Sequence, residues 1–400
     1  MSDKTAAMSG QLRADLVIVG GGIMGLWAAL KAERRGMDVI LIEATRIASG
    51  ASGGLLGALM AHMPDRWNEK KQLQFDGLLS LEAEIATLEA ETGLSAGYRR
   101  CGRLIPLPKP HLRPIAERHS REAETNWCQQ GRDFAWSVVD GSPFAGWPSD
   151  RFCGAGVVHD TFAGRVSPRA LTAVIRAGLE QKGRVRLVEG AAVQSIDARA
   201  KAMHLADGRS VGFGDLLVAA GVASFPLLST LGPAPDKPLG RGVKGQAALL
   251  KVDLPEDLPL LYLDGLYVVP HEGGHVAIGS TSENQFDDPF STDAQLDALI
   301  SEARALAPVL KQAEVVERWA GLRPKAIDRD PMVGPHPDHP HIHALTGGFK
   351  VSFGIAHLLA DAALDVIDGQ ALPLPHSFTL AHHVSVAARR ADVKEFTEIP

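Results

Sequence analysis

The sequence predicts an α/β protein of two domains, the first of which opens with a β-turn-α-β unit. Three observations support this fold class. The chain has 400 residues, which favours two domains of roughly 150 to 200 residues over a single core. Its composition, 45% hydrophobic and 22% charged, is that of an average globular protein. Near the N-terminus, finally, a glycine-rich turn separates two apolar segments of different periodicity.

The β-turn-α-β unit occupies residues 15–43. Residues 15–19, DLVIV, are rich in β-branched side chains and stop at a glycine, which indicates a short buried strand. Residues 24–35 indicate a helix that ends in basic residues just before Gly36, and both features are favourable at a helix C-terminus. Residues 37–43, MDVILIE, indicate the second strand.

The glycines between the first strand and the helix have the spacing Gly20-x-Gly22-x-x-Gly25. The first glycine permits the tight turn, the second lets the backbone approach a pyrophosphate, and the third lets the helix pack closely on the strand. Unpaired N–H groups at the helix start favour the anion, and Glu43 at the end of the second strand is placed to accept hydrogen bonds from ribose hydroxyls. A plain glycine turn is the alternative, but this context favours a Rossmann-type dinucleotide site.

The segment that follows, residues 43–63, bears on which dinucleotide is bound. It is rich in glycine and serine and nearly uncharged, with Arg46 near its start. Such a segment can thread under an extended ligand and offer it backbone amides. A plain nicotinamide domain would continue with further β-α units, so the segment favours FAD, although the first unit alone leaves NAD open.

Charge, cysteine content and hydropathy exclude several classes of protein. The net charge of -6 and the pI near 6.2 argue against nucleic-acid binding. Cys101, Cys128 and Cys153 have no paired short spacing, so neither zinc nor a disulfide framework is indicated, and a reducing, cytoplasmic location is expected. The N-terminus is polar, and the uncharged run 16–30 is shorter than the ~20 residues that cross a bilayer, so no signal or transmembrane segment is expected.

The histidine-rich run HPDHPHIH, residues 336–343, superficially suggests a metal site. Its prolines and the lack of nearby cysteine or glutamate favour a surface loop instead. No metal ligands are therefore assigned.

Several ordered motifs carry a resemblance to a known family. Besides the N-terminal unit and ASGASGG, they are GRVSPRAL (164–171), LLVAAGVAS (216–224), YVVPHEGGHVAIGSTSE (267–283), WAGLRP (319–324) and TGGFKVSFGIAHLLAD (346–361). With these motifs the chain resembles the D-amino-acid oxidase-like (DAO) family of FAD enzymes, particularly glycine oxidases and sarcosine oxidase-type amine oxidoreductases. The resemblance implies a glutathione-reductase-type FAD fold with a β-sheet-rich substrate domain.

The resemblance also implies how the chain is divided. The expected parts are an FAD-binding domain of residues 12–65, 155–230 and 325–378, a substrate domain of residues 66–154 and 231–324, and terminal extensions 1–11 and 379–400. The residues are compatible with this. Leu78, Leu81, Ile85 and Leu88 recur at helical spacing. DGLYVVP and GGHVAIGST are expected to be strands joined at Gly273-Gly274.

The resemblance implies three catalytic residues. Arg323 in WAGLRP matches the position that grips the substrate carboxylate, where a guanidinium can donate two parallel hydrogen bonds. Tyr267 matches an active-site tyrosine, with a buried structural tyrosine as an equal alternative, and Tyr262 is held in reserve. Lys350 stands where some glycine oxidases have arginine, and since lysine has no planar fork, glycine itself is put in doubt as the substrate.

The expected cofactor contacts come from the same motifs. Val193 resembles a valine whose backbone contacts adenine, Ala220-Gly221 a turn beside the pyrophosphate, and the segment from Gly347 to Ile355 a loop beside the isoalloxazine ring. His62 is a further residue that could face the flavin. The full expected set is Gly20, Gly22, Ile23, Met24, Gly25, Glu43, Ala44, Arg46, Ser49, Ala51, Ser52, Gly53, Val193, Ala220, Gly221, Gly347, Gly348, Lys350, Val351 and Ser352. Because no cysteine follows Cys153, non-covalent FAD is expected.

The leading functional hypothesis is FAD-dependent oxidative deamination or demethylation of a small amino acid or secondary amine. Hydride would pass to flavin N5, the imine would hydrolyse, and oxygen would reoxidise the flavin. One alternative is a dehydrogenase of a D-amino acid or 2-hydroxy acid that passes electrons to a quinone or carrier. Another is a non-catalytic FAD-containing subunit of a complex. The expected partners are the substrate, oxygen or an electron carrier, and a possible second copy of the chain.

Overall fold

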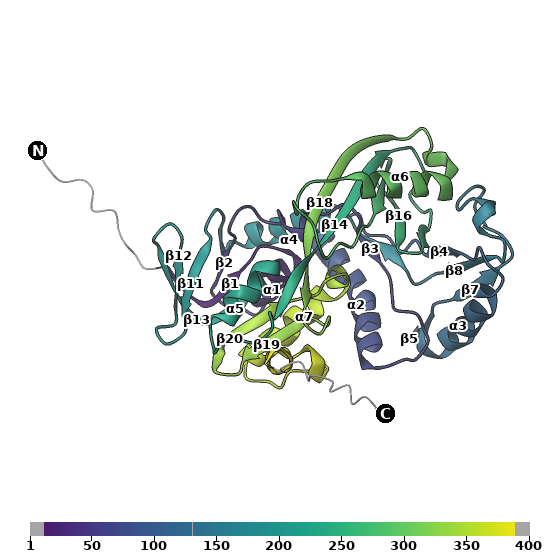
Figure 1. The fold of residues 1–400 in the computed structure, drawn as a ribbon. Helices are drawn as coiled ribbons and strands as arrows, with labels where there is room; N and C mark the ends of the chain where they lie inside the picture. The colour runs from purple at the N-terminus through teal and green to yellow at the C-terminus, as the bar shows by residue number, and fades with distance from the viewer. Residues whose placement is uncertain (1–11, 130, 389–400) are drawn as a thin grey trace, which may run out of the picture.

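The computed structural model describes residues 12–129 and 131–388 and consists of two large β-sheets with helices packed against them (Figure 1). Of the expected terminal extensions, residues 1–11 and 389–400 lie outside the described residues. Within the described residues, no helix has both the length and the apolar character that crossing a membrane requires.

The first sheet contains the N-terminal unit and has eight strands. Its main path is β10-β2-β1-β13-β12-β11, and β20 joins at β13 with β19 beside it. β10, β2, β1, β13 and β20 run parallel, whereas β12, β11 and β19 are antiparallel to their neighbours. The strands are β1 (Leu12–Val19), β2 (Val39–Ile42), β10 (Val185–Val188), β11 (Val193–Asp197), β12 (Ala202–Leu205), β13 (Ser210–Val218), β19 (Met332–His336) and β20 (His339–Thr346).

The predicted β-turn-α-β unit is confirmed, with shifted ends. The first strand begins at Leu12, the helix α1 spans Ile23–Arg34, and the second strand is limited to Val39–Ile42. Strand β1 is fully buried from Leu16 to Ile18 because apolar clusters cover both faces of the sheet: Leu16 and Ile18 pack in one cluster and Val17 in the other. Burial on both faces explains why its sequence is a continuous apolar run.

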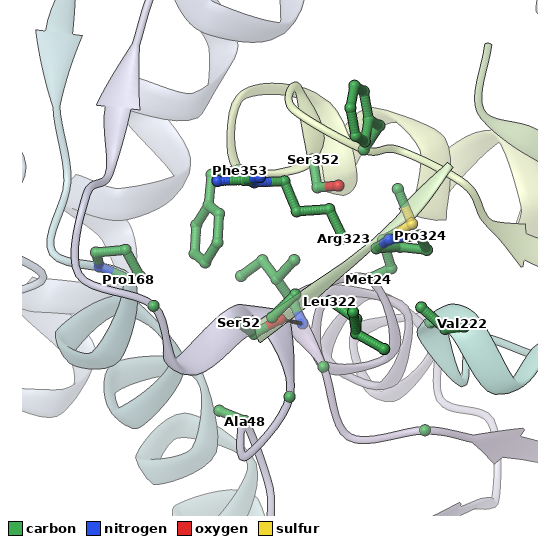
Figure 2. Close-up of a pocket in the computed structure, with 18 of the residues that line it drawn as sticks. Met24, Ala48, Ser52, Pro168, Val222, Leu322, Arg323, Pro324, Ser352 and Phe353 are labelled. Carbon is green, nitrogen blue, oxygen red and sulfur yellow. Dashed lines mark hydrogen bonds between the residues drawn. The ribbon is translucent and has the colours of Figure 1, made fainter. Parts of the chain in front are cut away.

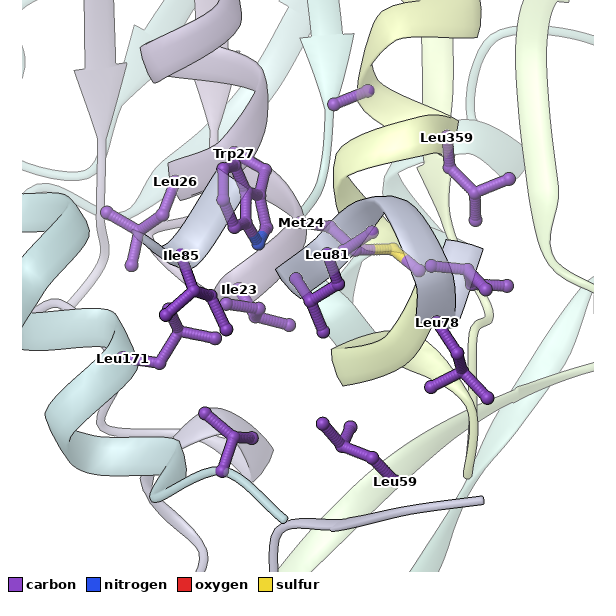
Figure 3. Packing of buried hydrophobic residues seen from close by; sticks show 14 of the residues in the cluster. Ile23, Met24, Leu26, Trp27, Leu59, Leu78, Leu81, Ile85, Leu171 and Leu359 are labelled. Atoms are coloured by element: carbon purple, nitrogen blue, oxygen red, sulfur yellow. The ribbon is translucent and has the colours of Figure 1, made fainter. Parts of the chain in front are cut away.

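Helices α1, α2 (Glu69–Thr92), α4 (Pro168–Lys182) and α7 (Ser352–Ile367) pack on one another in a single apolar cluster (Figure 3). The residues predicted to recur at helical spacing, Leu78, Leu81, Ile85 and Leu88, are all buried in α2. The prediction of an amphipathic helix is therefore confirmed. Although the helix was expected in the substrate domain, this face contacts α4 and α7, so it covers helices that lie on the first sheet.

The second sheet also has eight strands, in the order β18-β14-β17-β16-β15-β4-β8-β7. The predicted hairpin is confirmed, since β16 and β17 are antiparallel neighbours on either side of the Gly273-Gly274 turn. The strands are β4 (Arg103–Pro106), β7 (Trp136–Val139), β8 (Val157–Asp160), β14 (Gly240–Lys251), β15 (Leu260–Leu263), β16 (Leu266–His271), β17 (His275–Gly279) and β18 (Glu314–Ala326). Residues 157–160, expected in the cofactor domain, thus lie in this sheet because β8 pairs with β4 and β7.

The remaining elements are short or peripheral. They are the helices α3 (Leu112–Asn126), α5 (Ser224–Ser229), α6 (Ala294–Leu306) and α8 (Leu380–Ala387), the strands β3 (Ala58–Leu59), β5 (Cys128–Gln129), β6 (Arg132–Asp133) and β9 (Gly164–Arg165), and the 3-10 turns η1 (Ala51–Gly53), η2 (Asp150–Phe152), η3 (Gly221–Ala223), η4 (Pro308–Leu310) and η5 (His376–Phe378). Helix α8 packs on β19 and buries Leu380 and His383, so residues 380–387 are part of the folded body rather than an extension.

The histidine-rich run is not a surface loop, and that prediction was wrong. It forms the turn and flanking residues of the antiparallel β19–β20 hairpin, in which His336 and His343 are buried. The histidines bond to separate partners: His339 Nε2 lies 2.8 Å from Leu231 O, and His343 Nε2 lies 3.1 Å from Asp215 Oδ1. Within the described part of the chain, no three His, Cys, Asp or Glu side chains are grouped as metal ligands.

Candidate cofactor and substrate site

A single cavity of about 1020 Å³ is lined by residues of both sheets. From the first sheet come the start of α1, the segment that follows β2, and the turns after β13 and β20. From the second come β18 and residues of β14 and β16. The cavity therefore joins the expected dinucleotide turn to the WAGLRP strand.

The turn before α1 is shaped by its glycines. Gly20 has φ +110°, and a Cβ there would lie 2.4 Å from Ala219 O, so no other residue fits. A Cβ at Gly25 would lie 1.9 Å from Gly20 O, which is why Gly25 packs the helix on the strand without lining the cavity. Gly22, in contrast, lines the cavity, and a Cβ at this position would have Ser52 Oγ as its nearest neighbour, at 3.2 Å.

The N-terminus of α1 faces this cavity with its amides largely free. Gly22 is the N-cap and supplies no side-chain cap, and the first turn holds no acidic residue. The Ile23 N–H is bonded by a side chain, to Ser52 Oγ at 2.9 Å. Exposed amides and the positive end of the helix dipole make this end favourable for a phosphate group.

Glu43 lies at the edge of the cavity and is held by backbone amides. Its Oε2 accepts from Gly21 N at 2.8 Å, and its Oε1 accepts from Thr45 N at 2.9 Å. These bonds fix the carboxylate after β2, and its remaining acceptor capacity can serve a ribose hydroxyl.

Most of the other expected cofactor residues also line the cavity. The exceptions besides Gly25 are Gly53, Gly347 and Gly348, where the missing side chain leaves room for neighbouring residues. A Cβ at Gly53 would lie 2.5 Å from Ala48 O, and one at Gly348 would lie 2.4 Å from Met24 Cε. The expected residues that line the cavity are Gly20, Gly22, Ile23, Met24, Glu43, Ala44, Arg46, Ser49, Ala51, Ser52, Val193, Ala220, Gly221, Lys350, Val351 and Ser352.

A second helix N-terminus, that of α7, also faces the cavity. Val351, Ser352, Phe353 and Gly354 line it, Val351 caps the helix without a side-chain bond, and the first turn of α7 holds no acidic residue. Two positive helix ends thus lie on one cavity. The arrangement fits FAD, whose pyrophosphate suits the first end and whose ring, when it carries negative charge, suits the second.

Arg323 of β18 enters the cavity between these two ends, as Figure 2 shows with Ser52 on one side and Ser352 on the other. Its Nη1 donates to Thr281 O at 3.2 Å, and it makes no ion pair with any carboxylate of the described residues. Burial lowers the pKa of the guanidinium below its usual value, although at neutral pH an arginine stays charged. The cavity therefore holds a fixed positive charge with unused N–H donors.

Tyr267 and Lys350 line the same cavity. Burial raises the pKa of the Tyr267 hydroxyl, so it is protonated and can donate a hydrogen bond. Lys350 is exposed at the rim, where desolvation together with the charges of Arg323 and Lys325 lowers its pKa. Tyr262 does not line the cavity, and its ring packs on that of Tyr267 at 4.9 Å between centroids.

The sequence analysis missed much of the apolar wall. Trp319 is two residues before Gly321 and four before Arg323, so on a strand all three face the same side, and this alternation could have identified the indole. The alternation could not identify Ala247, because Ala247 belongs to a separate strand, β14, in which it lies opposite Trp319. The missed lining residues of this region are Ala247, Ser280, Phe290, Trp319 and Leu322. Leu55, Leu56 and Met60 also line the cavity and lie in the expected segment 43–63, Phe353 lies in the expected segment 347–355, and His62 lines the cavity, as its position in the sequence suggested.

Comparison with known proteins agrees with this geometry. Residues 15–362 match the family model described as DAO, FAD dependent oxidoreductase. The chain belongs to this family. It is thus an FAD-dependent oxidoreductase, and the matched region includes the α1 turn, Arg323 and the start of α7.

Individual relatives of this oxidoreductase are distant in sequence. It is 28% identical to the glycine oxidase of Pseudomonas aeruginosa, over 89% of this chain and 95% of that one. It is 26% identical to the bifunctional protein ThiO/ThiG of a Nostoc species over 88% of this chain, and it spans about half (52%) of that longer protein. The crystal structure of glycine oxidase from Geobacillus kaustophilus superposes with a TM-score of 0.82 at 22% identity, covering 92% of this chain and 99% of that one.

Proposed function

We propose that the enzyme oxidises a small amino acid or secondary amine that carries a carboxylate. The observation that carries the proposal is Arg323, a charged side chain in the cavity with no carboxylate partner among the described residues. A carboxylate of the substrate would complete it with two parallel N–H bonds. Relatives named glycine oxidase support a small amino-acid substrate.

We further propose that FAD is held non-covalently in the domain built on the first sheet, with the boundaries expected from the sequence changed at residues 157–160, at helix α2 and at helix α8. None of Cys101, Cys128 and Cys153 lines the cavity, which supports the absence of a thioether link. The amides at the start of α1 would hold the pyrophosphate, and Glu43 a ribose. Bound FAD supplies the two-electron acceptor and is returned to its oxidised form by oxygen.

The residues near Arg323 would orient the substrate rather than react with it. Tyr267 can donate a second hydrogen bond to the carboxylate, and Trp319 forms an apolar wall that excludes water. Among the lining residues the only carboxylate is Glu43, whose oxygens accept backbone amides. No carboxylate base of the described lining residues therefore stands at the substrate end, and the reaction uses the amine in its uncharged form.

The overall change balances without a protein nucleophile. The amine loses two electrons and two protons as one Cα–H and one N–H bond break, and the C=N bond of an imine forms. Water then hydrolyses the imine to a carbonyl compound and a free amine or ammonia. With oxygen as the final acceptor the other product is hydrogen peroxide. One equivalent of peroxide per carbonyl under air supports an oxidase, whereas product without peroxide indicates a separate electron carrier.

Anaerobic bleaching of the flavin absorbance tests the proposal. Glycine, sarcosine, D-amino acids, other N-methylated amino acids and 2-hydroxy acids are mixed singly with the holoenzyme. We expect at least one amine with a carboxylate to bleach it, and Arg323→Ala to keep FAD while raising KM by about 100-fold or more, the loss of a charge-assisted pair. Bleaching only by hydroxy acids, bleaching by none, or an Arg323→Ala enzyme with unchanged kinetics contradicts the proposal.

A further inference from the structure

Arg323 lies directly over the backbone of a neighbouring strand. In the ladder between β14 and β18, Gly245 is opposite Gly321, and Val243 is opposite Arg323. The guanidinium leans diagonally onto Gly245: a Cβ at that position would lie 2.1 Å from Nη1, 2.1 Å from Nη2 and 2.2 Å from Cζ. The space that a side chain at residue 245 would fill is therefore taken by the charged end of Arg323.

The residues on either side of Gly245 fix the acceptor that Arg323 uses. Gln246 N donates to Thr281 Oγ1 at 2.9 Å, and the backbones of Lys244 and Glu283 exchange two hydrogen bonds of 3.0 and 2.9 Å. The segment 281–283 is thus held against β14 beside Gly245. Its Thr281 carbonyl receives the Arg323 Nη1–H at 3.2 Å.

A glycine also makes room for the other large side chain on this face. A Cβ at Gly321 would lie 2.5 Å from Trp319 Cζ2, so the indole folds over Gly321 as the guanidinium folds over Gly245. The facing glycine pair thus leaves a strip of bare backbone on which both side chains lie while lining the cavity.

We propose that Gly245 is a positioning residue for the substrate carboxylate. Because it has no side chain, the Arg323 guanidinium can lie directly on the backbone of β14, in the position where Nη1 donates to the Thr281 carbonyl. This inference rests on the proposed function, because it takes Arg323 as the carboxylate clamp. A methyl group at residue 245 displaces the guanidinium by about 1 Å or more, and a misplacement of that size in a positioning contact costs up to about 100-fold. The backbone need not move, because the obstructed atoms are the end of a flexible side chain.

The test is a double-mutant cycle on the holoenzyme with acetate as the probe, titrated by the change in flavin absorbance. The variants are Gly245→Ala, Arg323→Ala and the two combined, and FAD content and Tm are measured for each. Gly212→Ala is the matched control, since it too adds a methyl beside an arginine in a strand, but at an ordinary 3.4 Å from Arg13 Cγ.

We expect Gly245→Ala to raise the Kd of acetate by tenfold or more in the presence of Arg323 and by less than twofold in the Arg323→Ala background. FAD content and Tm should match those of Gly212→Ala. Three outcomes overturn this inference and leave the proposed function standing: an unchanged Kd of acetate in Gly245→Ala, an equal change of the Kd in both backgrounds, or loss of FAD from Gly245→Ala. If acetate fails to bind the unsubstituted enzyme, or binds Arg323→Ala equally well, the proposed function fails and the inference fails with it.

Discussion

Substitution of Gly22 separates the role of the glycine turn in cofactor binding from its role in folding. Gly22 has φ -77° and ψ 179°, an ordinary extended conformation, and the nearest obstacle to a Cβ is Ser52 Oγ at 3.2 Å. The protein without cofactor should therefore accept Gly22→Val with a loss of only about 1 kcal/mol, the range for replacing a helix N-cap. The added methyl groups occupy the cavity beside the free amides of α1.

The expected loss of FAD affinity is much larger. A hydrogen bond from a backbone amide to a charged group contributes about 1.5–3 kcal/mol, so moving the pyrophosphate away from two such amides costs about 3–6 kcal/mol. The Kd for FAD should thus rise by about 100-fold to 10,000-fold. Gly141→Val, at an exposed bend with no atom within 4 Å of its Cβ, is the control that should leave the Kd unchanged.

The assay combines FAD occupancy after purification, titration of the cofactor-free protein followed by flavin fluorescence, and thermal unfolding of the cofactor-free protein. Colourless Gly22→Val protein with a near-normal Tm supports the reasoning. Fully yellow protein refutes the assignment of the pyrophosphate to this turn. Unfolded cofactor-free protein shows instead that Gly22 is needed by the fold.

Three other predictions follow from the charges of the molecule. Asp160→Asn leaves the buried Arg103, 2.6 Å away, without its partner and should reduce the free energy of unfolding by about 3–5 kcal/mol in urea titrations; a change below 1 kcal/mol contradicts this. Desolvation raises the pKa of Glu84, but the bond from Lys31 and other cationic contacts lower it overall. The stabilisation by Glu84 is therefore complete above the pKa of the unfolded state and is lost as the pH falls through the pKa of the folded state. Glu84→Gln should reduce the free energy of unfolding by about 1–3 kcal/mol at pH 7 and by little at pH 2. An equal reduction at both pH values contradicts this. Desolvation and nearby cations lower the pKa of Lys350, so its positive charge is lost as the pH rises toward 10. Acetate should therefore bind the holoenzyme less tightly at high pH, and Lys350→Arg should move this loss of affinity to a higher pH. A Kd for acetate that does not depend on pH contradicts the prediction.

The sequence was sufficient for the cofactor turn because its requirements are local. Gly25 is required by its contact with Gly20 O in the same turn, and Gly20 by its contact with Ala219 O just after the adjacent strand β13, so their spacing indicates the geometry; the atom nearest to a Cβ at Gly22 is Ser52 Oγ, in the separate turn η1. The β19–β20 hairpin was missed since its prolines read as a loop, whereas pairing with β13 and packing by α8 override that local preference. Gly245 could not be identified either, because its contact with Arg323 depends on the pairing of strands about 70 residues apart.

The two sheets meet at the point where substrate and cofactor must be aligned. Phe349 N donates to Pro324 O at 3.1 Å, and Lys325 forms an isolated antiparallel bridge with Gly348. In an antiparallel pairing, the position beyond Pro324 and Phe349 brings Arg323 opposite Lys350, so backbone bonds set Arg323, the proposed substrate clamp, beside the loop that leads into α7. Since hydride transfer depends steeply on the placement of the substrate against the cofactor, alignment by backbone bonds explains how residues from separate sheets can act on one reaction. It also accounts for Gly348, whose lack of a side chain lets this loop close onto Met24 at the start of α1.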